Sequence, residues 1–193
     1  MNAVEPLILA SSSPQRGAIL TGLGIPFKTA LPQCDETLPE DMSADAAAGY
    51  LAERKARSVP GGAGWVLGAD TVVVLGGRIY GKPRDESEAA RFLGALSGRT
   101  HTVYSALALR RGDRVDTRTS ATEVTFKTLH EGEIAWYVDT GEWRGAAGGY
   151  RIQGRGARFI SRIFGSPSGV VGLPIFELYD ILVSRGYVFQ GQS

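Results

Sequence analysis

Several polar side chains occur at positions where the local sequence pattern does not explain them. They carry hydroxyl groups, positive charges or carboxylates. They are Ser11, Ser13, Arg16, Glu36, Lys55, Asp70 and Lys82. Carboxylates are hard oxygen ligands for Mg²⁺ or Mn²⁺, and such an ion bridges one or two of them to substrate phosphates. Basic groups neutralise phosphate oxygens as charge moves onto a leaving group. This set of side chains therefore indicates phosphate chemistry assisted by a divalent cation.

Two other kinds of site fit the residues less well. Cys34, His101 and His130 have no spacing typical of transition-metal ligands. A cysteine or serine hydrolase that pairs Cys34 or Ser13 with a histidine lacks a nucleophile-elbow sequence. We expect both histidines to be structural, His101 within a strand and His130 in the first turn of a helix.

The segment from Leu7 to Arg16 is a candidate anion site. Its apolar start, residues 7–10, suits a buried strand, and Ser13 before Pro14 suits an N-cap followed by the first helical position. Backbone N–H groups, serine hydroxyls and the Arg16 guanidinium would then face one small volume that fits a phosphate. A helix cap that binds nothing explains the same residues, and it is the simpler interpretation of this segment alone.

Asp70 interrupts the most strand-like segment of the chain, residues 65–75. A buried charge costs several kcal/mol unless a cation, a metal ion or hydrogen bonds compensate it, so Asp70 is a candidate site residue. The alternative is an Asp at a strand end that caps a turn. Lys55 is expected on a helix that begins after Ser43, with its stem buried and its ammonium reaching a cleft. Lys82 is expected on a loop, and for both lysines an ordinary surface position is the alternative.

Predicted helices and strands alternate along the chain. The expected strands cover residues 7–10, 25–30, 65–75, 78–80, 101–111, 115–127 and 157–164. The expected helices start at Pro14, Ser43, Asp85, Thr128 and Pro174, the one at Thr128 from a capping box with Glu131. A turn is expected over residues 165–168. This alternation, with strands of both senses, predicts an α/β fold with a mixed sheet flanked by helices.

Length and composition narrow the class of protein. A chain of 193 residues suits one domain, residues 1–193, and a net charge of +1 gives no reason to expect a nucleic acid polymer or an anionic membrane as partner. A single cysteine, Cys34, excludes an internal disulfide and makes a reducing cytoplasm the expected location. We expect no signal peptide and no membrane span, because residues 1–6 carry no cation and no long apolar run follows.

Short motifs in a fixed order resemble the Maf family of nucleoside triphosphate pyrophosphatases along nearly the whole chain. The first is Ser11-Ser12-Ser13-Pro14-Gln15-Arg16, which is similar to the family's S-x-S-P-R-R turn, and Gly68-Ala69-Asp70-Thr71-Val72 is similar to its catalytic strand. The others are residues 51–56, 81–83, 97–104, 150–154 and 171–174. No single motif is decisive, and their order makes the resemblance specific.

The resemblance implies an inosine-triphosphatase-like architecture and hydrolysis of a nucleoside triphosphate to a monophosphate and pyrophosphate, with a divalent cation, Mg²⁺ or Mn²⁺, as cofactor. By position, Asp70 would be the acid-base residue that takes a proton from the attacking water, with metal binding as its alternative role. Glu36 and Asp70 would hold the ion. The phosphate-binding residues would be Ser11, Ser13, Arg16, Lys55 and Lys82.

Within the family, the positions of Gln15, Thr71 and Gln153 are associated with base selection. Thr71 and Gln153 resemble members that act on dTTP and UTP. Gln15 departs from the pattern, because those members carry Arg there and the 7-methyl-GTP-selective members carry Trp, so the base stays open. Two more departures are Ala146, where many members have Lys, and Arg151, where many have Gly.

The resemblance also suggests a homodimer. Because the family name comes from septum formation, a nucleotide-binding regulator of cell division without turnover is the alternative to an enzyme. Asp70, Glu36 and Lys82 together favour the enzyme, because a binding protein has little need of a buried base.

Overall fold

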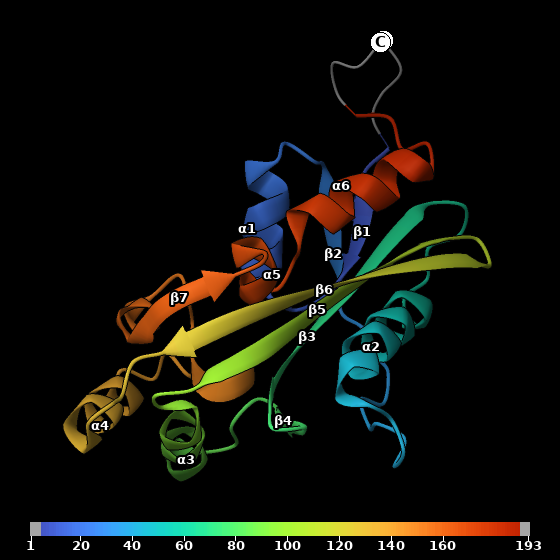
Figure 1. The fold of residues 1–193 in the computed structure, drawn as a ribbon. Helices are drawn as coiled ribbons and strands as arrows, with labels where there is room; N and C mark the ends of the chain where they lie inside the picture. Colours follow the sequence, from blue (N-terminus) through green and yellow to red (C-terminus); the bar gives the residue numbers. More distant parts are fainter. Residues whose placement is uncertain (1–4, 190–193) are drawn as a thin grey trace.

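The computed structural model describes residues 5–189, so the segment before Glu5 that entered the signal-peptide prediction lies outside it. One mixed sheet has the strand order β2-β1-β3-β5-β6-β7, with β4 paired to β3 (Figure 1). The strands are β1 (Leu7–Ala10), β2 (Phe27–Ala30), β3 (Trp65–Leu75), β4 (Arg78–Tyr80), β5 (Thr100–Arg111), β6 (Arg114–Phe126) and β7 (Ile160–Phe164). β1 runs parallel to β2 and β3, and the remaining pairs are antiparallel. The predicted mixed α/β fold is confirmed.

Helices cover both faces of the long strands and one end of the sheet. They are α1 (Pro14–Gly22), α2 (Ala44–Ser58), α3 (Glu86–Leu96), α4 (Glu131–Asp139), α5 (Pro167–Val171) and α6 (Ile175–Ser184), with 3₁₀ turns at Ala147–Gly149 and Arg155–Phe159. In Figure 1, α2 lies on one side of β3 and β5, α1 and α6 lie on the other, and α3 and α4 lie at the far end. Each of these three groups of helices packs against the sheet through its own cluster of buried apolar residues. No helix within residues 5–189 is long and apolar enough to cross a membrane.

Three local predictions were wrong, and in each a hydrogen bond between a side chain and the backbone sets the boundary. The strand expected over 157–164 begins only at Ile160, because a 3₁₀ turn precedes it whose N–H groups bind the Glu142 carboxylate. The turn expected over 165–168 is the start of α5, where Ser166 caps the Gly169 N–H at 3.1 Å. The fourth helix is capped at His130, where Glu133 accepts the His130 N–H at 3.1 Å, and not at Thr128 with Glu131.

Asp70 lies in the middle of β3, opposite Ala106 of β5, so the alternative that it caps a strand end is wrong. Helix α2 packs directly over this part of the strand. A Cβ built on Gly68 would lie 2.2 Å from the Ala52 carbonyl oxygen and 2.7 Å from the Ala56 nitrogen. Because Lys55 belongs to α2, the bare backbone of Gly68 allows Lys55 to approach Asp70.

We therefore expect Gly68→Ala to lower the free energy of unfolding by about 1–3 kcal/mol, since backbone atoms cannot yield as a flexible side chain would. The displaced α2 should also carry Lys55 away from Asp70 and reduce activity. Denaturant unfolding measures the first effect, and steady-state kinetics measures the second. Gly94→Ala on α3 is the matched control: its Cβ would meet nothing within 4 Å, so it should stabilise the fold by roughly 0.5–1 kcal/mol. A Gly68→Ala variant as stable as the parent would contradict this account of the contact.

Candidate functional site

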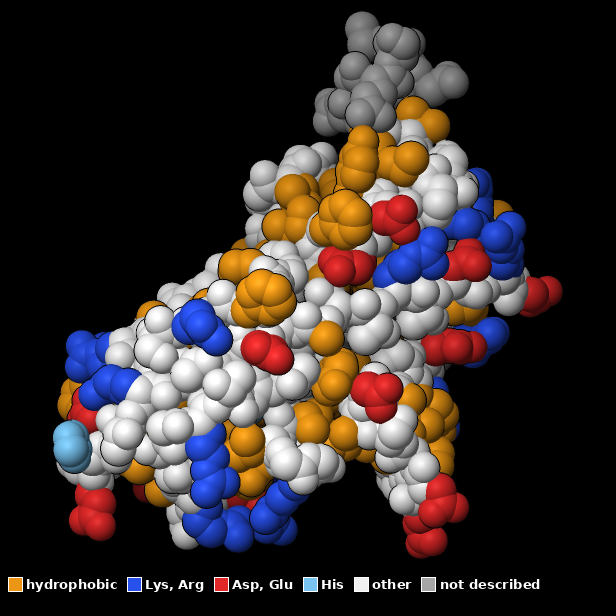
Figure 2. All heavy atoms as spheres, in the orientation of Figure 1, with side chains coloured by type: hydrophobic (Ala, Val, Ile, Leu, Met, Phe, Trp, Pro, Cys, Tyr) orange, Lys and Arg blue, Asp and Glu red, His pale blue; other side chains and the backbone are white. Residues whose placement is uncertain are grey.

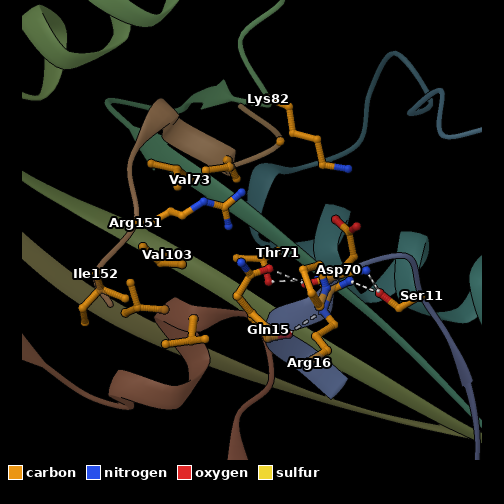
Figure 3. A pocket seen from close by; sticks show the side chains of 18 of the residues that line it. Ser11, Gln15, Arg16, Asp70, Thr71, Val73, Lys82, Val103, Arg151 and Ile152 are labelled. Carbon is orange, nitrogen blue, oxygen red and sulfur yellow. Dashed lines mark hydrogen bonds between the residues drawn. The ribbon is translucent and has the colours of Figure 1, made fainter. Parts of the chain in front are cut away.

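A cavity of about 510 Å³ lies where the start of α1, the middle of β3, the loop after β4 and the segment before the second 3₁₀ turn meet (Figure 3). Every site residue predicted from the sequence lines it: Ser11, Ser13, Gln15, Arg16, Glu36, Lys55, Asp70, Thr71, Lys82 and Gln153. These residues come from strands, helices and loops between Ser11 and Gln153. The fold therefore gathers the whole predicted set in one place.

Lys55 and Asp70 form a buried ion pair at the wall of this cavity. The Lys55 Nζ lies 2.5 Å from Asp70 Oδ1 and 3.2 Å from Glu36 Oε1, and the Lys55 and Asp70 side chains are only 5% and 9% exposed. The Glu36 side chain is 49% exposed, so this carboxylate faces solvent at the rim. A buried lysine and a buried aspartate compensate each other, because either charge alone would be costly at this depth.

Arg16 is buried at the base of the cavity and holds three elements together. Its Nε donates to the Gly172 carbonyl at 2.8 Å, Nη1 to Ser11 Oγ at 3.1 Å and Nη2 to Thr71 Oγ1 at 3.3 Å. Burial lowers the pKa of Arg16, while the charges of Asp70 and Glu36 oppose that shift. The guanidinium nevertheless stays charged at neutral pH. Arg16 thus joins α1 and β3 to the end of α5 and fixes the Ser11 hydroxyl.

The neighbouring hydrogen bonds determine where the hydroxyl hydrogens of Thr71 and Ser105 point. Ser105 Oγ lies 2.5 Å from the Gly169 carbonyl oxygen, which can only accept, so Ser105 donates its single hydrogen there. Thr71 Oγ1 lies 2.9 Å from Ser105 Oγ and must therefore be the donor of that pair. Since Arg16 donates to Thr71, the Thr71 hydroxyl can only accept from a further group.

The first turn of α1 departs from its predicted capping role. Ser13 occupies the N-cap position, yet its hydroxyl makes no capping bond and instead donates to Gln15 Oε1 at 3.1 Å. Ser11 takes over part of that role by accepting the Ser13 N–H at 3.1 Å. With Gln15 Oε1 engaged, its amide NH₂ remains as a donor group on the cavity wall.

Several lining residues were missed by sequence reasoning, and Glu142 is the clearest. Its carboxylate accepts the N–H groups of Arg155 and Gly156, each at 3.1 Å, and so shapes the wall near Gln153. No local pattern marks a carboxylate that caps a turn more than ten residues further along the chain. Tyr150, Val73 and Val103 also line the cavity.

The Maf-like protein family model matches residues 6–185 of this chain. The chain belongs to the Maf-like family. Curated relatives of this Maf-like chain include proteins named dTTP/UTP pyrophosphatase from three bacteria. The Symbiobacterium thermophilum protein is 46% identical and covers 97% of this chain and 98% of its own. The Thermus thermophilus protein is 45% identical, and the match covers 94% of this chain and 96% of that protein. The Myxococcus xanthus protein is 44% identical, covering 96% of each.

Two solved structures that match this Maf-like chain are more distant than these relatives. The Ham1 protein of Staphylococcus aureus has a TM-score of 0.44 and 13% identity, covering 63% of this chain and 72% of its own. The HAM1 protein of Coxiella burnetii has a TM-score of 0.40 and 18% identity, and the match covers 63% of this chain and 73% of that protein. The family assignment comes from the sequence matches.

Beneath the cavity of this Maf-like chain, His101 is buried against aromatic rings. Its Nε2 lies 2.8 Å from the Tyr150 hydroxyl, and its ring packs edge-on against Phe126 with centroids 5.1 Å apart. Among the described residues Nδ1 has no hydrogen-bond partner. Burial lowers the pKa of His101 to about 4 and raises the pKa of Tyr150. Both groups are therefore neutral near pH 7.

This burial makes the stability of the fold depend on pH. The unfolded chain binds a proton at His101 near pH 6.5 while the folded chain does not, so stability should fall as pH drops from roughly 6.5 towards 4, by up to about 3 kcal/mol. Urea unfolding at intervals between roughly pH 7 and pH 5 measures this slope. His101→Phe should flatten it, whereas His130→Gln, at an exposed helix cap, should leave it unchanged. An unaltered slope in His101→Phe would assign the acid sensitivity to other groups.

Proposed function

We propose that this Maf-like chain hydrolyses the α–β phosphoanhydride bond of a nucleoside triphosphate, giving a nucleoside monophosphate and pyrophosphate, with UTP and dTTP as preferred substrates. One observation carries the proposal: the Lys55 ammonium lies 2.5 Å from Asp70 and 3.2 Å from Glu36 in a cavity lined by the whole predicted set. The relatives' names, dTTP/UTP pyrophosphatase, agree with it. Residues 5–185 form one sheet with its helices, which supports a single Maf-like domain.

In this proposal Asp70 takes the proton of the attacking water. The carboxylate is fixed by Lys55 on one side and by the rigid centre of β3 beneath it, as a general base requires. The Lys55 ammonium has three N–H donors and gives one of them to Asp70, so donors remain for a phosphate oxygen. Ser11 and Ser13 complete the phosphate side at the start of α1.

The two carboxylates suit the divalent cation that the family requires. Residues 5–189 contain no group of three or more His, Cys, Asp or Glu side chains arranged for a metal ion. Mg²⁺ needs no such group, because one or two carboxylates and the substrate phosphates suffice. Glu36 and Asp70 would hold Mg²⁺ or Mn²⁺, which would neutralise negative charge on the phosphates.

Hydrogen-bond direction supports a uracil or thymine base. The Thr71 hydroxyl is available only as an acceptor, which suits the imide N–H of these bases and not the unprotonated ring nitrogen of cytosine. Gln15 offers its amide NH₂, a donor for a base carbonyl, in the position where related enzymes carry an arginine donor. The departure at Gln15 thus preserves the donor character of the position.

Pyrophosphate release from a panel of UTP, dTTP, CTP and 7-methyl-GTP with Mg²⁺ or Mn²⁺ tests this function. We expect UTP and dTTP to have the highest kcat/KM, Gln15→Arg to keep that order, and Gln15→Trp to shift it towards 7-methyl-GTP. Nucleotide binding without pyrophosphate release would instead favour a regulator. A preference for CTP would contradict the assignment of uracil and thymine as the preferred bases.

We infer a cytoplasmic location and a homodimer as the form of this enzyme. The nucleotide substrates and the single Cys34 support the location. For the dimer, the support is an apolar surface along α6, where Phe176, Tyr179 and Val183 are 76%, 51% and 50% exposed (Figure 2). Light scattering should give twice the mass of one chain, and Phe176→Glu should halve it. A monomeric parent protein would overturn the dimer.

A further inference from the structure

Arg151 is a cation whose side chain is held by backbone carbonyls alone. Its Nε donates to the Glu142 carbonyl at 2.9 Å, and its Nη2 donates to the Arg144 carbonyl at 2.7 Å. Its own backbone N–H donates to the Tyr137 hydroxyl at 3.1 Å, so both ends of the residue are anchored. A guanidinium has five N–H donors in a fixed plane, and three of these remain unused by the two carbonyls.

The charges on the cavity wall separate into paired and unpaired groups. Lys55 is balanced by Asp70 and Glu36, and Arg16 is surrounded by acceptors at the base of the cavity. The Glu142 carboxylate is engaged by two backbone N–H groups. In the part of the chain between Glu5 and Phe189, neither Lys82 nor Arg151 forms an ion pair. These two cations therefore lack a counter-charge.

Lys82 and Arg151 reach the same space from different segments. Figure 3 shows the Arg151 guanidinium and the Lys82 ammonium directed into the opening above Thr71 and Asp70, and both residues line the cavity. Two unpaired cations facing one cavity repel each other when it holds only water. A ligand with several negative charges removes that repulsion and is attracted by both.

We propose that Arg151 binds the phosphate chain of the substrate together with Lys82, and that it also binds the pyrophosphate product. This inference rests on the proposed function for the identity of the substrate. The guanidinium is already fixed by the two carbonyls, so binding loses little side-chain entropy. The remaining N–H groups lie in the plane of the guanidinium and can bind two phosphate oxygens at once. A lysine ammonium cannot reproduce this paired geometry.

The test compares Arg151→Gln and Arg151→Lys with the parent protein in two assays. Arg151→Gln should raise the KM for UTP and the inhibition constant of inorganic pyrophosphate by about tenfold or more, because charge-assisted hydrogen bonds are lost. The change should be the same for UTP, dTTP and CTP, since a phosphate contact does not read the base. Arg151→Lys should recover part of the affinity. Arg162→Gln is the matched control, because Arg162 is exposed on β7 and does not line the cavity.

A merely structural role of Arg151 gives a different pattern. It would lower the melting temperature of the ligand-free protein and leave the pyrophosphate-induced rise in melting temperature intact. An unchanged inhibition constant and an unchanged KM in Arg151→Gln would overturn the proposal. If the parent protein hydrolyses no nucleotide, the proposed function fails, but calorimetric titration with magnesium pyrophosphate still tests Arg151 by itself.

Discussion

Replacing Asp70 by Asn is expected to lower kcat by about 10²–10⁴-fold, the range that general-base catalysis contributes, while nucleotide binding persists. The amide oxygen can still accept a hydrogen bond from Lys55, and Glu36 still balances the lysine charge at 3.2 Å. The cavity should therefore keep its shape and its affinity for phosphates. Steady-state kinetics with UTP and calorimetric titration of a non-hydrolysable analogue measure the two properties separately.

The control for this variant is Asp113→Asn, which makes the same chemical change in an exposed turn between β5 and β6. It should leave kcat and KM unaltered. Full activity in Asp70→Asn would remove Asp70 from the role of base. Loss of nucleotide binding together with activity would instead indicate that Asp70 acts chiefly through the metal ion.

Replacing Lys55 by Met is expected to have the largest effect on stability. It leaves the Asp70 carboxylate, 9% exposed, without the ammonium 2.5 Å away, and breaking a buried pair costs about 3–5 kcal/mol. For a chain of this length the melting temperature should fall by roughly 6–20 °C. Activity should be lost as well, because the base is no longer fixed and a phosphate contact is gone. Thermal and urea unfolding measure the change.

A double-mutant cycle separates charge burial from lost packing. Adding Asp70→Asn to Lys55→Met removes the unpaired carboxylate, so the double variant should recover much of the stability and none of the activity. Arg57→Met, on the same helix, removes an exposed cation whose pair with Glu53 has side chains 52% and 42% exposed. That change should alter the free energy of unfolding by less than about 1 kcal/mol. Additive losses in the double variant would contradict a direct Lys55–Asp70 coupling.

The fold and the members of the site could be predicted where the signal is local. The apolar run around Asp70 marks a strand whose single charge needs a partner, and the structure supplies Lys55 at 2.5 Å. The Ser13-Pro14 pair marked the start of α1 correctly. The Maf-like family assignment was likewise predicted from ordered motifs and is confirmed by the match over residues 6–185.

Contacts between distant segments could not be predicted. Nothing near Arg16 indicates that its guanidinium is bound to the carbonyl of Gly172, which lies in the turn after α5. The Glu142 carboxylate caps a 3₁₀ turn more than ten residues later, and that contact replaced the expected start of β7. A sequence pattern indicates which residues do not fit their local surroundings. It does not indicate their hydrogen-bond partners, because these depend on how the helices and strands pack.

The central claim, that water attacks the α-phosphate of a nucleoside triphosphate in this cavity, can be tested by one measurement. UTP is hydrolysed in ¹⁸O-labelled water with Mg²⁺, and the products are identified by ³¹P NMR. The account predicts UMP that carries the label and pyrophosphate that does not. Labelled pyrophosphate, or UDP with inorganic phosphate, would contradict it.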